Sequence, residues 1–202
     1  MAIKRETPEV NAGSMADIAF LLLIFFLVTT TLETDAGLSR KLPTTNDPSK
    51  IKERNLFRVN LNGSNQLLVE GQVLDIKDLR EEAIAFLDNG RLYSGDGYCS
   101  YCKGNRDDLS SDNPQKAIIS LSNTRETNYG HYITVQNELV GAYNALRNRE
   151  AMRIYRVSYE DLMADYEDGK LSQEDKAVFK AKIEKIRELF PKNLSEAELN
   201  SK

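Results

Sequence analysis

Hydrophobic residues gather in one unbroken run near the start of the chain. The run covers residues 18–28, and three threonines and Leu32 continue it. A helix over residues 14–33 is roughly 30 Å long at about 1.5 Å per residue, which matches the hydrocarbon core of a bilayer. We therefore predict a single transmembrane helix over residues 14–33, with Asp17 as its one ionisable residue.

Two other interpretations of this run stay open. A cleaved signal peptide begins with basic residues, whereas here Glu6 and Glu9 offset Lys4 and Arg5. A buried helix of a soluble domain usually has a polar face, and residues 18–28 offer none. The pattern favours a membrane anchor over both.

Hydrophobicity alternates with a period of two after a polar stretch. Residues 34–55 contain Pro43 and Pro48 and show no helical period, so we expect a linker there. Residues 56–61 and 66–69 then alternate on either side of an Asn-Gly pair, which is a strong signal for a tight β-hairpin turn. We predict that these two runs form a β-hairpin.

Two stretches with helical periodicity follow the predicted hairpin. Asp75 is a candidate N-cap, and the apolar residues after it share one face of a helix that an Asn-Gly pair ends. Residues 117–121 are apolar on both faces and predict a central strand, Asn128 opens a second helix, and residues 153–157 are the candidate last strand. The order ββαβαβ predicts a small α+β domain over residues 56–157, with helices on one sheet face.

The C-terminal tail has a third helical period. Ser172 and Asp175 resemble a capping box, and apolar residues at helical spacing continue to Phe190, before Pro191 ends the helix. We predict a helical C-terminal extension over residues 158–202 that packs on the domain. An amphipathic helix that binds a partner is the alternative.

Charge and residue counts exclude several functions. The chain has 27 Lys and Arg against 31 Asp and Glu and no basic patch, so nucleic acid is not an expected partner. Two cysteines and one histidine exclude a metal site built from many such ligands. The sequence also has no nucleophile–histidine–acid set and no phosphate-binding glycine loop. We therefore expect no metal, no cofactor and no enzyme activity.

The orientation of the predicted anchor depends on segment length. Lysines and arginines on the two sides of the run nearly balance, so charge alone does not decide. A short tail, residues 1–13, is easily retained in the cytoplasm while a long domain is translocated. We expect a cytoplasmic N-terminus and a domain outside the cytoplasm.

Asp17 is the first candidate functional residue. At a helical period it shares its face with Leu21, Ile24, Val28 and Thr31, none of which carries a counter-charge. A carboxyl group in apolar surroundings favours its neutral form, so it can take up a proton and release it where water is present. We predict that Asp17 carries protons; a structural hydrogen bond to a neighbouring helix is the alternative.

Cys99 and Cys102 are the second candidate feature. A thioredoxin-type Cys-x-x-Cys motif has its first cysteine at the start of a helix, whereas glycine-rich loop sequence flanks this pair. In an oxidising compartment outside the cytoplasm we predict a local disulfide that stiffens a polar insertion over residues 91–114. A membrane-tethered thiol oxidoreductase is the enzyme alternative.

Three stretches of the chain carry a family resemblance. They are SMADIAFLLLIFFLVTT at residues 14–30, a Leu-Pro pair at 42–43 and a Tyr-Gly pair at 129–130. With the ββαβαβ order they resemble the ExbD/TolR family of biopolymer transport proteins, particularly forms from Bacteroidetes-type bacteria. The resemblance covers about residues 10–157, and the chain lacks the proline that many members carry shortly before the aspartate.

This resemblance implies a proton-motive-force transducing subunit of a motor complex in the bacterial inner membrane. It implies an ExbB/TolQ-like multi-helix partner whose pentameric pore contains two copies of the helix, with Asp17 as the proton-coupled residue and Thr29, Thr30 and Thr31 lining the pore. The resemblance further implies that the domain is periplasmic, that it binds a TonB- or TolA-like transmitter or peptidoglycan, and that it serves energised transport or envelope work at the outer membrane. An anchored adaptor or cell-wall-binding protein without proton coupling is the alternative.

Overall fold

The computed structural model describes residues 12–29, 51–168 and 172–198, which belong to two compact units. The first unit lies within residues 1–41 and contains helix α1 (Ala12–Thr29). The second lies within residues 42–202 and begins its described part with a short 3-10 turn, η2 (Glu53–Asn55).

The predicted transmembrane helix is not found, and the fold-class prediction is wrong in this respect. Along the described residues no helix is both long enough and apolar enough to cross a membrane. The sequence of α1 supplies a physical reason. Its first turns contain Gly13, Ser14 and Asp17, and the uninterrupted apolar run covers only residues 18–28. That run is about 16 Å of helix, roughly half of a bilayer core.

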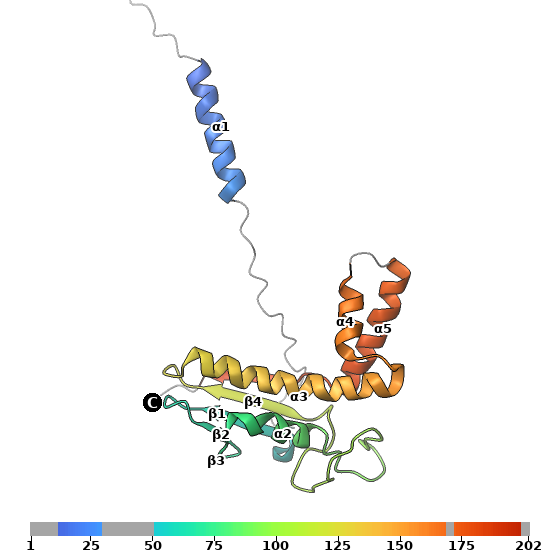
Figure 1. Ribbon diagram of the computed structural model, residues 1–202. Helices are drawn as coiled ribbons and strands as arrows, with labels where there is room; N and C mark the ends of the chain where they lie inside the picture. The colour runs from blue at the N-terminus through green and yellow to red at the C-terminus, as the bar shows by residue number, and fades with distance from the viewer. Residues whose placement is uncertain (1–11, 30–50, 169–171, 199–202) are drawn as a thin grey trace, which may run out of the picture. The chain divides into compact units, whose positions relative to one another are not determined.

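A five-stranded sheet organises the second unit (Figure 1). The strands are β1 (Leu56–Leu61), β2 (Leu67–Val69), β3 (Gln72–Val73), β4 (Ile118–Asn123) and β5 (Leu194–Glu198), in the order β3-β2-β1-β4-β5. β1, β2 and β3 pair antiparallel, whereas β4 is parallel to both β1 and β5. The predicted hairpin at residues 56–69 is therefore present.

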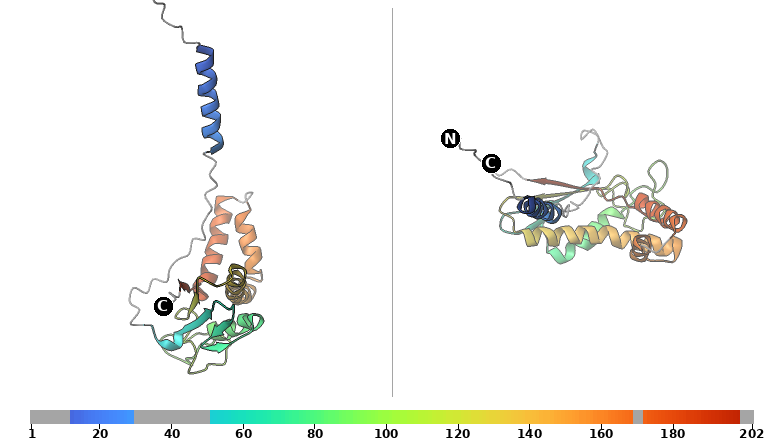
Figure 2. Two further views of the ribbon diagram at one scale, coloured as in Figure 1. Left: turned by 90° about the vertical axis from the view of Figure 1, so that its left-hand side faces the viewer. Right: turned by 90° about the horizontal axis from the view of Figure 1, so that it is seen from above.

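Helices α2 (Ile76–Leu87) and α3 (Tyr129–Tyr155) lie together beside the sheet, as two directions of view show (Figure 2). β1 alternates between buried and half-buried residues, and its buried side chains Phe57, Val59 and Leu61 belong to the same core cluster as residues of both helices. The predicted cap at Asp75 is present, and Asn128, predicted to open the second helix, caps α3: each accepts a hydrogen bond from a backbone N–H two residues later.

The predicted last strand at residues 153–157 is wrong. Residues 153–155 continue helix α3, which ends at Arg156 in the left-handed conformation with φ 59°. Ile154, Tyr155 and Val157 pack against a second hydrophobic cluster, formed with the C-terminal extension. A run of five residues is too short to show a strand period, and packing against the extension selected the helix.

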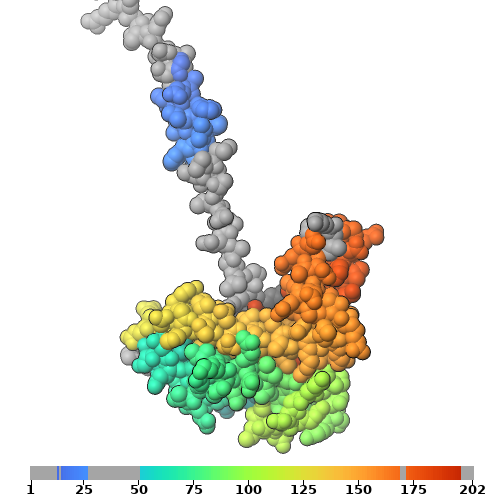
Figure 3. Space-filling model, viewed as in Figure 1, coloured from blue at the N-terminus to red at the C-terminus, as the bar shows by residue number. Residues whose placement is uncertain are grey.

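The C-terminal extension forms two helices and the fifth strand. Helices α4 (Tyr159–Glu167) and α5 (Gln173–Leu189) pack at one end of α3 and protrude from the body of this unit (Figure 3). Ser172 caps α5 as predicted. The chain then returns to the sheet, where Leu194 pairs with Ile119 and β5 runs parallel to β4. The sequence does not predict β5, because serine, glutamate and alanine are poor strand formers.

Candidate functional site

Asp17 lies near the start of α1, a helix without lysine or arginine. Its side chain is exposed, and so are Leu21 and Ile24 on the same face. Exposed apolar side chains also cover the remaining sides of the helix: Met15, Ile18, Phe20, Leu22, Leu23, Phe25 and Phe26. An apolar surface of this extent is typical of a site that another protein or a lipid covers.

The three threonines predicted beside Asp17 can be placed only in part. Thr29 is the last residue of α1. Thr30 and Thr31 lie outside the described residues. A pore-lining role for the three thereby stays a prediction.

A buried polar network fixes the insertion between α2 and β4. The side-chain amide of Asn89 donates to the carbonyls of Asp107 and Ser111, both at 2.9 Å, and its oxygen accepts from the Asp107 N–H at 2.8 Å. The Ser111 hydroxyl donates to the Phe86 carbonyl at the end of α2. Asn89 and Ser111 are both buried, so these bonds replace water and give the insertion a defined conformation.

Asp112 connects the insertion to the start of β1. Its carboxylate accepts from Arg91 Nε at 2.9 Å and from Asn55 Nδ2 at 3.3 Å. Its backbone N–H donates to Asn55 Oδ1 at 2.8 Å. Burial raises the pKa of Asp112, but the hydrogen bonds from Arg91 and Asn55 and the charge of Lys52 outweigh burial and lower that pKa below its ordinary value. Asp112 is therefore ionised and paired at neutral pH.

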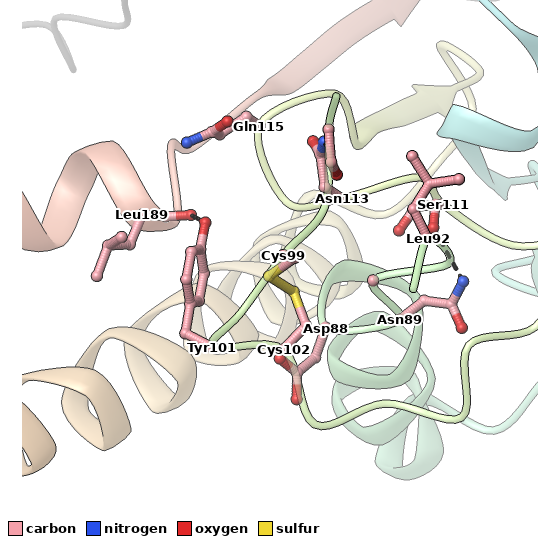
Figure 4. Close-up of a disulfide and its surroundings, with 12 residues drawn as sticks. Asp88, Asn89, Leu92, Cys99, Tyr101, Cys102, Ser111, Asn113, Gln115 and Leu189 are labelled. Atoms are coloured by element: carbon pink, nitrogen blue, oxygen red, sulfur yellow. Dashed lines mark hydrogen bonds between the residues drawn. A yellow bond between two sulfur atoms is a disulfide. The ribbon is translucent and has the colours of Figure 1, made fainter. Parts of the chain in front are cut away.

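Cys99 and Cys102 form a disulfide within the insertion (Figure 4). The two residues are 3% and 9% exposed. The bridge packs against Gly90, just after α2, where an added Cβ would lie 2.5 Å from the Cβ of Cys102. Cys99 lies in a loop and starts no helix, so the site lacks the helix N-terminus that activates a thioredoxin-type thiol. The geometry does not favour thiol catalysis.

Tyr101, between the two cysteines, joins the insertion to the C-terminal extension. Its hydroxyl donates to the Leu189 carbonyl at 2.8 Å, and Figure 4 shows the side chain pointing toward that residue. Its ring meets the Phe190 ring edge-on at 5.5 Å between centroids. Burial, together with the nearby carboxylates of Glu150 and Asp88, raises the pKa of Tyr101 to about 12. The phenol therefore keeps its proton and remains a donor at neutral pH.

Arg149 on α3 supports the same junction. It makes a two-pronged ion pair with Asp88, at 2.6 and 2.8 Å, and donates to the Tyr101 carbonyl at 3.3 Å. Its Nε donates to the fully buried Glu150 at 3.2 Å, and Arg153 Nε donates to the other Glu150 oxygen at 2.6 Å. The hydrogen bond with Asp88 raises the pKa of Arg149.

Arg147 fixes the point where α5 ends. Its Nε and Nη2 both donate to the Phe190 carbonyl, at 3.0 and 2.8 Å. Burial lowers the pKa of Arg147. Phe190 itself is completely buried, so the end of α5 is held by both its ring and its carbonyl.

The sequence does not predict the contacts that join the insertion, α3 and the C-terminal extension. Its pattern predicts a polar insertion over residues 91–114 and a helix that Asn128 opens, and singles out no charged residue of that helix. A signal was available, because Arg147 and Glu150 fall among buried positions of α3, and buried charges require partners. The partners of Glu150 are Arg149 and Arg153 on the same helix, whereas the sequence does not indicate that the partner of Arg147 is the Phe190 carbonyl of the extension.

The described part of the chain has no group of three or more histidine, cysteine or acidic side chains placed to hold a metal ion. It does contain a groove of about 910 Å³ beside the start of β1, between α2 and the insertion. Phe57 and Phe86 contribute apolar surface to the groove, and Glu81, Glu82 and Lys103 contribute charge.

Comparisons with known proteins identify relatives of most of the chain. The family described as "Biopolymer transport protein ExbD/TolR" matches residues 3–147, which excludes α4, α5 and β5. A curated relative, "Biopolymer transport protein exbD2" of Vibrio cholerae serotype O1, is 28% identical over 74 residues. These residues are 37% of this chain and 54% of that protein, so the chain matches about half the length of this relative.

Proposed function

Because the chain belongs to the ExbD/TolR family of biopolymer transport proteins, we propose that it is the ExbD-type subunit of a proton-driven complex. The complex uses the proton-motive force to energise biopolymer transport or envelope work at the outer membrane. Asp17 carries this proposal, since α1 presents a carboxyl group on an apolar helix that has no basic residue. No enzymatic reaction belongs to the proposal.

Asp17 takes up and releases the protons in this complex. Apolar surroundings favour the neutral carboxyl group, and a wetter place favours the carboxylate. One elementary charge that moves through 100 mV makes about 2.3 kcal/mol available for work. The exposed apolar side chains around Asp17 support this role, because they bring the carboxyl group into contact with a partner's apolar helices.

The partner of α1 is an ExbB/TolQ-like multi-helix protein of the bacterial inner membrane. Two copies of the chain bind the pentamer of this partner through α1, with Thr29, Thr30 and Thr31 facing its pore. The apolar surface of α1 supports this association, since water does not favour such a surface.

The second unit works in the periplasm. The disulfide between Cys99 and Cys102 supports this location, because disulfides persist in oxidising compartments and are rare in the cytosol. A TonB- or TolA-like transmitter or peptidoglycan is the target, and the groove beside β1 is large enough for a short segment of either.

Replacement of Asp17 tests the proposal. Asp17→Asn keeps the shape of the side chain but does not titrate, so the variant should co-purify with the partner and lose energy-dependent uptake. Asp17→Glu should keep partial uptake at most, because the longer side chain displaces the carboxyl group. The matched control is Asp165→Asn on the exposed side of α4, which should behave as wild type.

Uptake is measured in a strain that carries each variant at normal expression. Full uptake with Asp17→Asn would contradict proton coupling and leave an anchored adaptor as the function.

A further inference from the structure

β5 covers an edge of the sheet. β4 pairs with β1 on one side and with β5 on the other, in a register that runs from Ile119 and Leu194 to Asn123 and Glu198. Without β5, β4 would present a row of unpaired backbone N–H and C=O groups. Such an edge is the usual template on which an extended segment of another protein adds a strand.

Among the described side chains of β5, one is buried in the core. Leu194 is buried, whereas Ser195 is half-buried and Glu196 is exposed. Glu196 accepts a hydrogen bond from Gln136 Nε2 at 2.8 Å. The remaining strand residues are alanine and glutamate, which are depleted in strands. Attachment of β5 therefore depends on its backbone pairing with β4, on Leu194 and on the contacts that precede it in the chain.

Hydrogen bonds from three side chains help to position residues 189–193, just before β5. Arg147 donates twice to the Phe190 carbonyl. The side-chain amide of Asn193 donates to the carbonyls of Ala117 and Gln115, at 3.1 and 3.2 Å. The Tyr101 hydroxyl donates to the Leu189 carbonyl at 2.8 Å.

The Tyr101 contact depends on the disulfide. Tyr101 lies between Cys99 and Cys102, so the bridge closes a loop that contains Tyr101 and restricts its backbone. Without the bridge the loop gains conformational freedom, and ordering Tyr101 against Leu189 and Phe190 becomes more costly. We therefore expect the redox state of the two cysteines to affect the Tyr101 contact.

We propose that β5 is a displaceable cover of the β4 edge, that the Cys99–Cys102 disulfide keeps it in place through Tyr101, and that reduction frees this edge for an extended segment of a partner protein. A dithiol reductant supplies the two electrons. One of its thiolates attacks a bridge sulfur and forms a mixed disulfide, which its second thiol then cleaves. Cys99 and Cys102 end as two thiols and the reductant as a disulfide. This device is independent of Asp17.

The register specifies the chemistry of the partner segment. The residue that replaces Leu194 pairs with Ile119 and needs a leucine-sized apolar side chain. Two residues later, in the place of Glu196, a hydrogen-bond acceptor would meet Gln136. The expected ligand is therefore an extended segment with an apolar residue followed, at the second position after it, by an acidic or amide residue.

Hydrogen exchange of the full chain, read by mass spectrometry, tests the first step. Dithiothreitol should accelerate amide exchange in residues 190–198 and in β4, while residues 56–69 of the hairpin keep their rate. Unchanged exchange in residues 190–198 would overturn the proposal. A uniform acceleration over the whole second unit would overturn it too, because the disulfide would then support the whole fold and not the cover.

A single-atom change tests the role of Tyr101 with the disulfide intact. Tyr101→Phe keeps the ring against Phe190 but removes the donor to Leu189, and should accelerate exchange in residues 190–198 roughly fivefold. Tyr93→Phe is the matched control, since Tyr93 lies in the same insertion with its side chain exposed. Equal exchange in the two variants would show that Tyr101 does not hold the cover.

A peptide with the sequence of residues 191–198 tests the freed edge. The labelled peptide should bind the reduced chain at least about tenfold more tightly than the oxidised chain, and a peptide of scrambled order should bind neither. Because β5 competes within the same molecule, Leu194→Ser should strengthen binding in both states. Equal affinity for the two redox states, or no binding to the reduced chain and the Leu194→Ser variant, would refute the proposal.

Discussion

The hydroxyl of Tyr101 donates a hydrogen bond of 2.8 Å to the carbonyl of Leu189, across 88 positions of sequence. Tyr101 belongs to the disulfide-bonded insertion, which lies within the part of the chain that matches the family. Leu189 ends α5, in the extension that lies outside that match. The extension is therefore part of the folded unit, and its strand completes the sheet.

Loss of the Tyr101 hydroxyl should lower the free energy of unfolding by an amount that depends on pH. At neutral pH, Tyr101→Phe should lower the free energy of unfolding by about 1 kcal/mol, the usual value of one hydrogen bond. Because burial raises the pKa of Tyr101 from 10.0 to about 12, its contribution is complete below pH 10 and disappears as the pH rises through about 12.

Urea unfolding of wild type and variant across this alkaline range measures the effect. The difference between the two proteins should shrink as the pH rises, and Tyr93→Phe should show no such trend. A difference that stays constant up to about pH 12 would contradict the shifted pKa.

Gly90 should tolerate no side chain, because the disulfide occupies the space. Gly90 has φ +56°, and an added Cβ would lie 2.5 Å from the Cβ of Cys102. Gly95 has φ +85° but nothing within 4 Å of an added Cβ. Both alanine variants lose about 1 kcal/mol through backbone strain, and Gly90→Ala should lose about 2 kcal/mol more through overpacking. Chemical denaturation of the two variants gives the comparison; equal losses would mean that the insertion can shift.

Arg149→Lys should weaken the junction around Asp88. Lysine is a point charge and cannot reproduce the two-pronged contact of 2.6 and 2.8 Å, so the expected loss is about 2 kcal/mol in unfolding free energy. Arg80→Lys is the control, since Arg80 pairs with Glu138 through one bond on a half-exposed surface and should cost about 0.5 kcal/mol or less. Similar losses of unfolding free energy in the two variants would show that the Arg149–Asp88 ion pair stabilises the fold no more than an exposed ion pair does.

Asp112 should contribute to acid sensitivity. Its pKa is lower in the folded chain than its ordinary value of 3.8, so its contribution is present above that value and is lost as the pH falls through the folded pKa. Asp112→Asn should therefore be less stable than wild type by about 1–2 kcal/mol at neutral pH. This difference in unfolding free energy should become smaller in acid. Asp108→Asn removes a more distant, exposed partner of Arg91 and should leave the pH profile unchanged. Urea unfolding at neutral and acid pH provides the measurement.

The sequence by itself determined the features whose causes lie within a few residues. The hairpin follows from alternation around an Asn-Gly turn, and Asp75, Asn128 and Ser172 cap helices because a cap bonds to a backbone N–H two or three residues later. Asp17 can also be identified from neighbouring residues alone, because it is a charged residue on an otherwise apolar helix. Local pattern did not establish a membrane-crossing helix, because the apolar run before Thr29 is too short.

Only the tertiary structure decided the features whose partners are distant in sequence. Residues 194–198 have weak strand propensity and become β5 because the open edge of β4 offers backbone partners. Residues 153–155 remain helical because they pack against α4 and α5. The buried charge of Arg147 and the half-buried charge of Arg149 are satisfied by the Phe190 carbonyl and the Asp88 carboxylate, which lie 43 and 61 positions away in the chain. Such partners cannot be predicted from sequence periodicity, since each depends on how the chain folds back on itself.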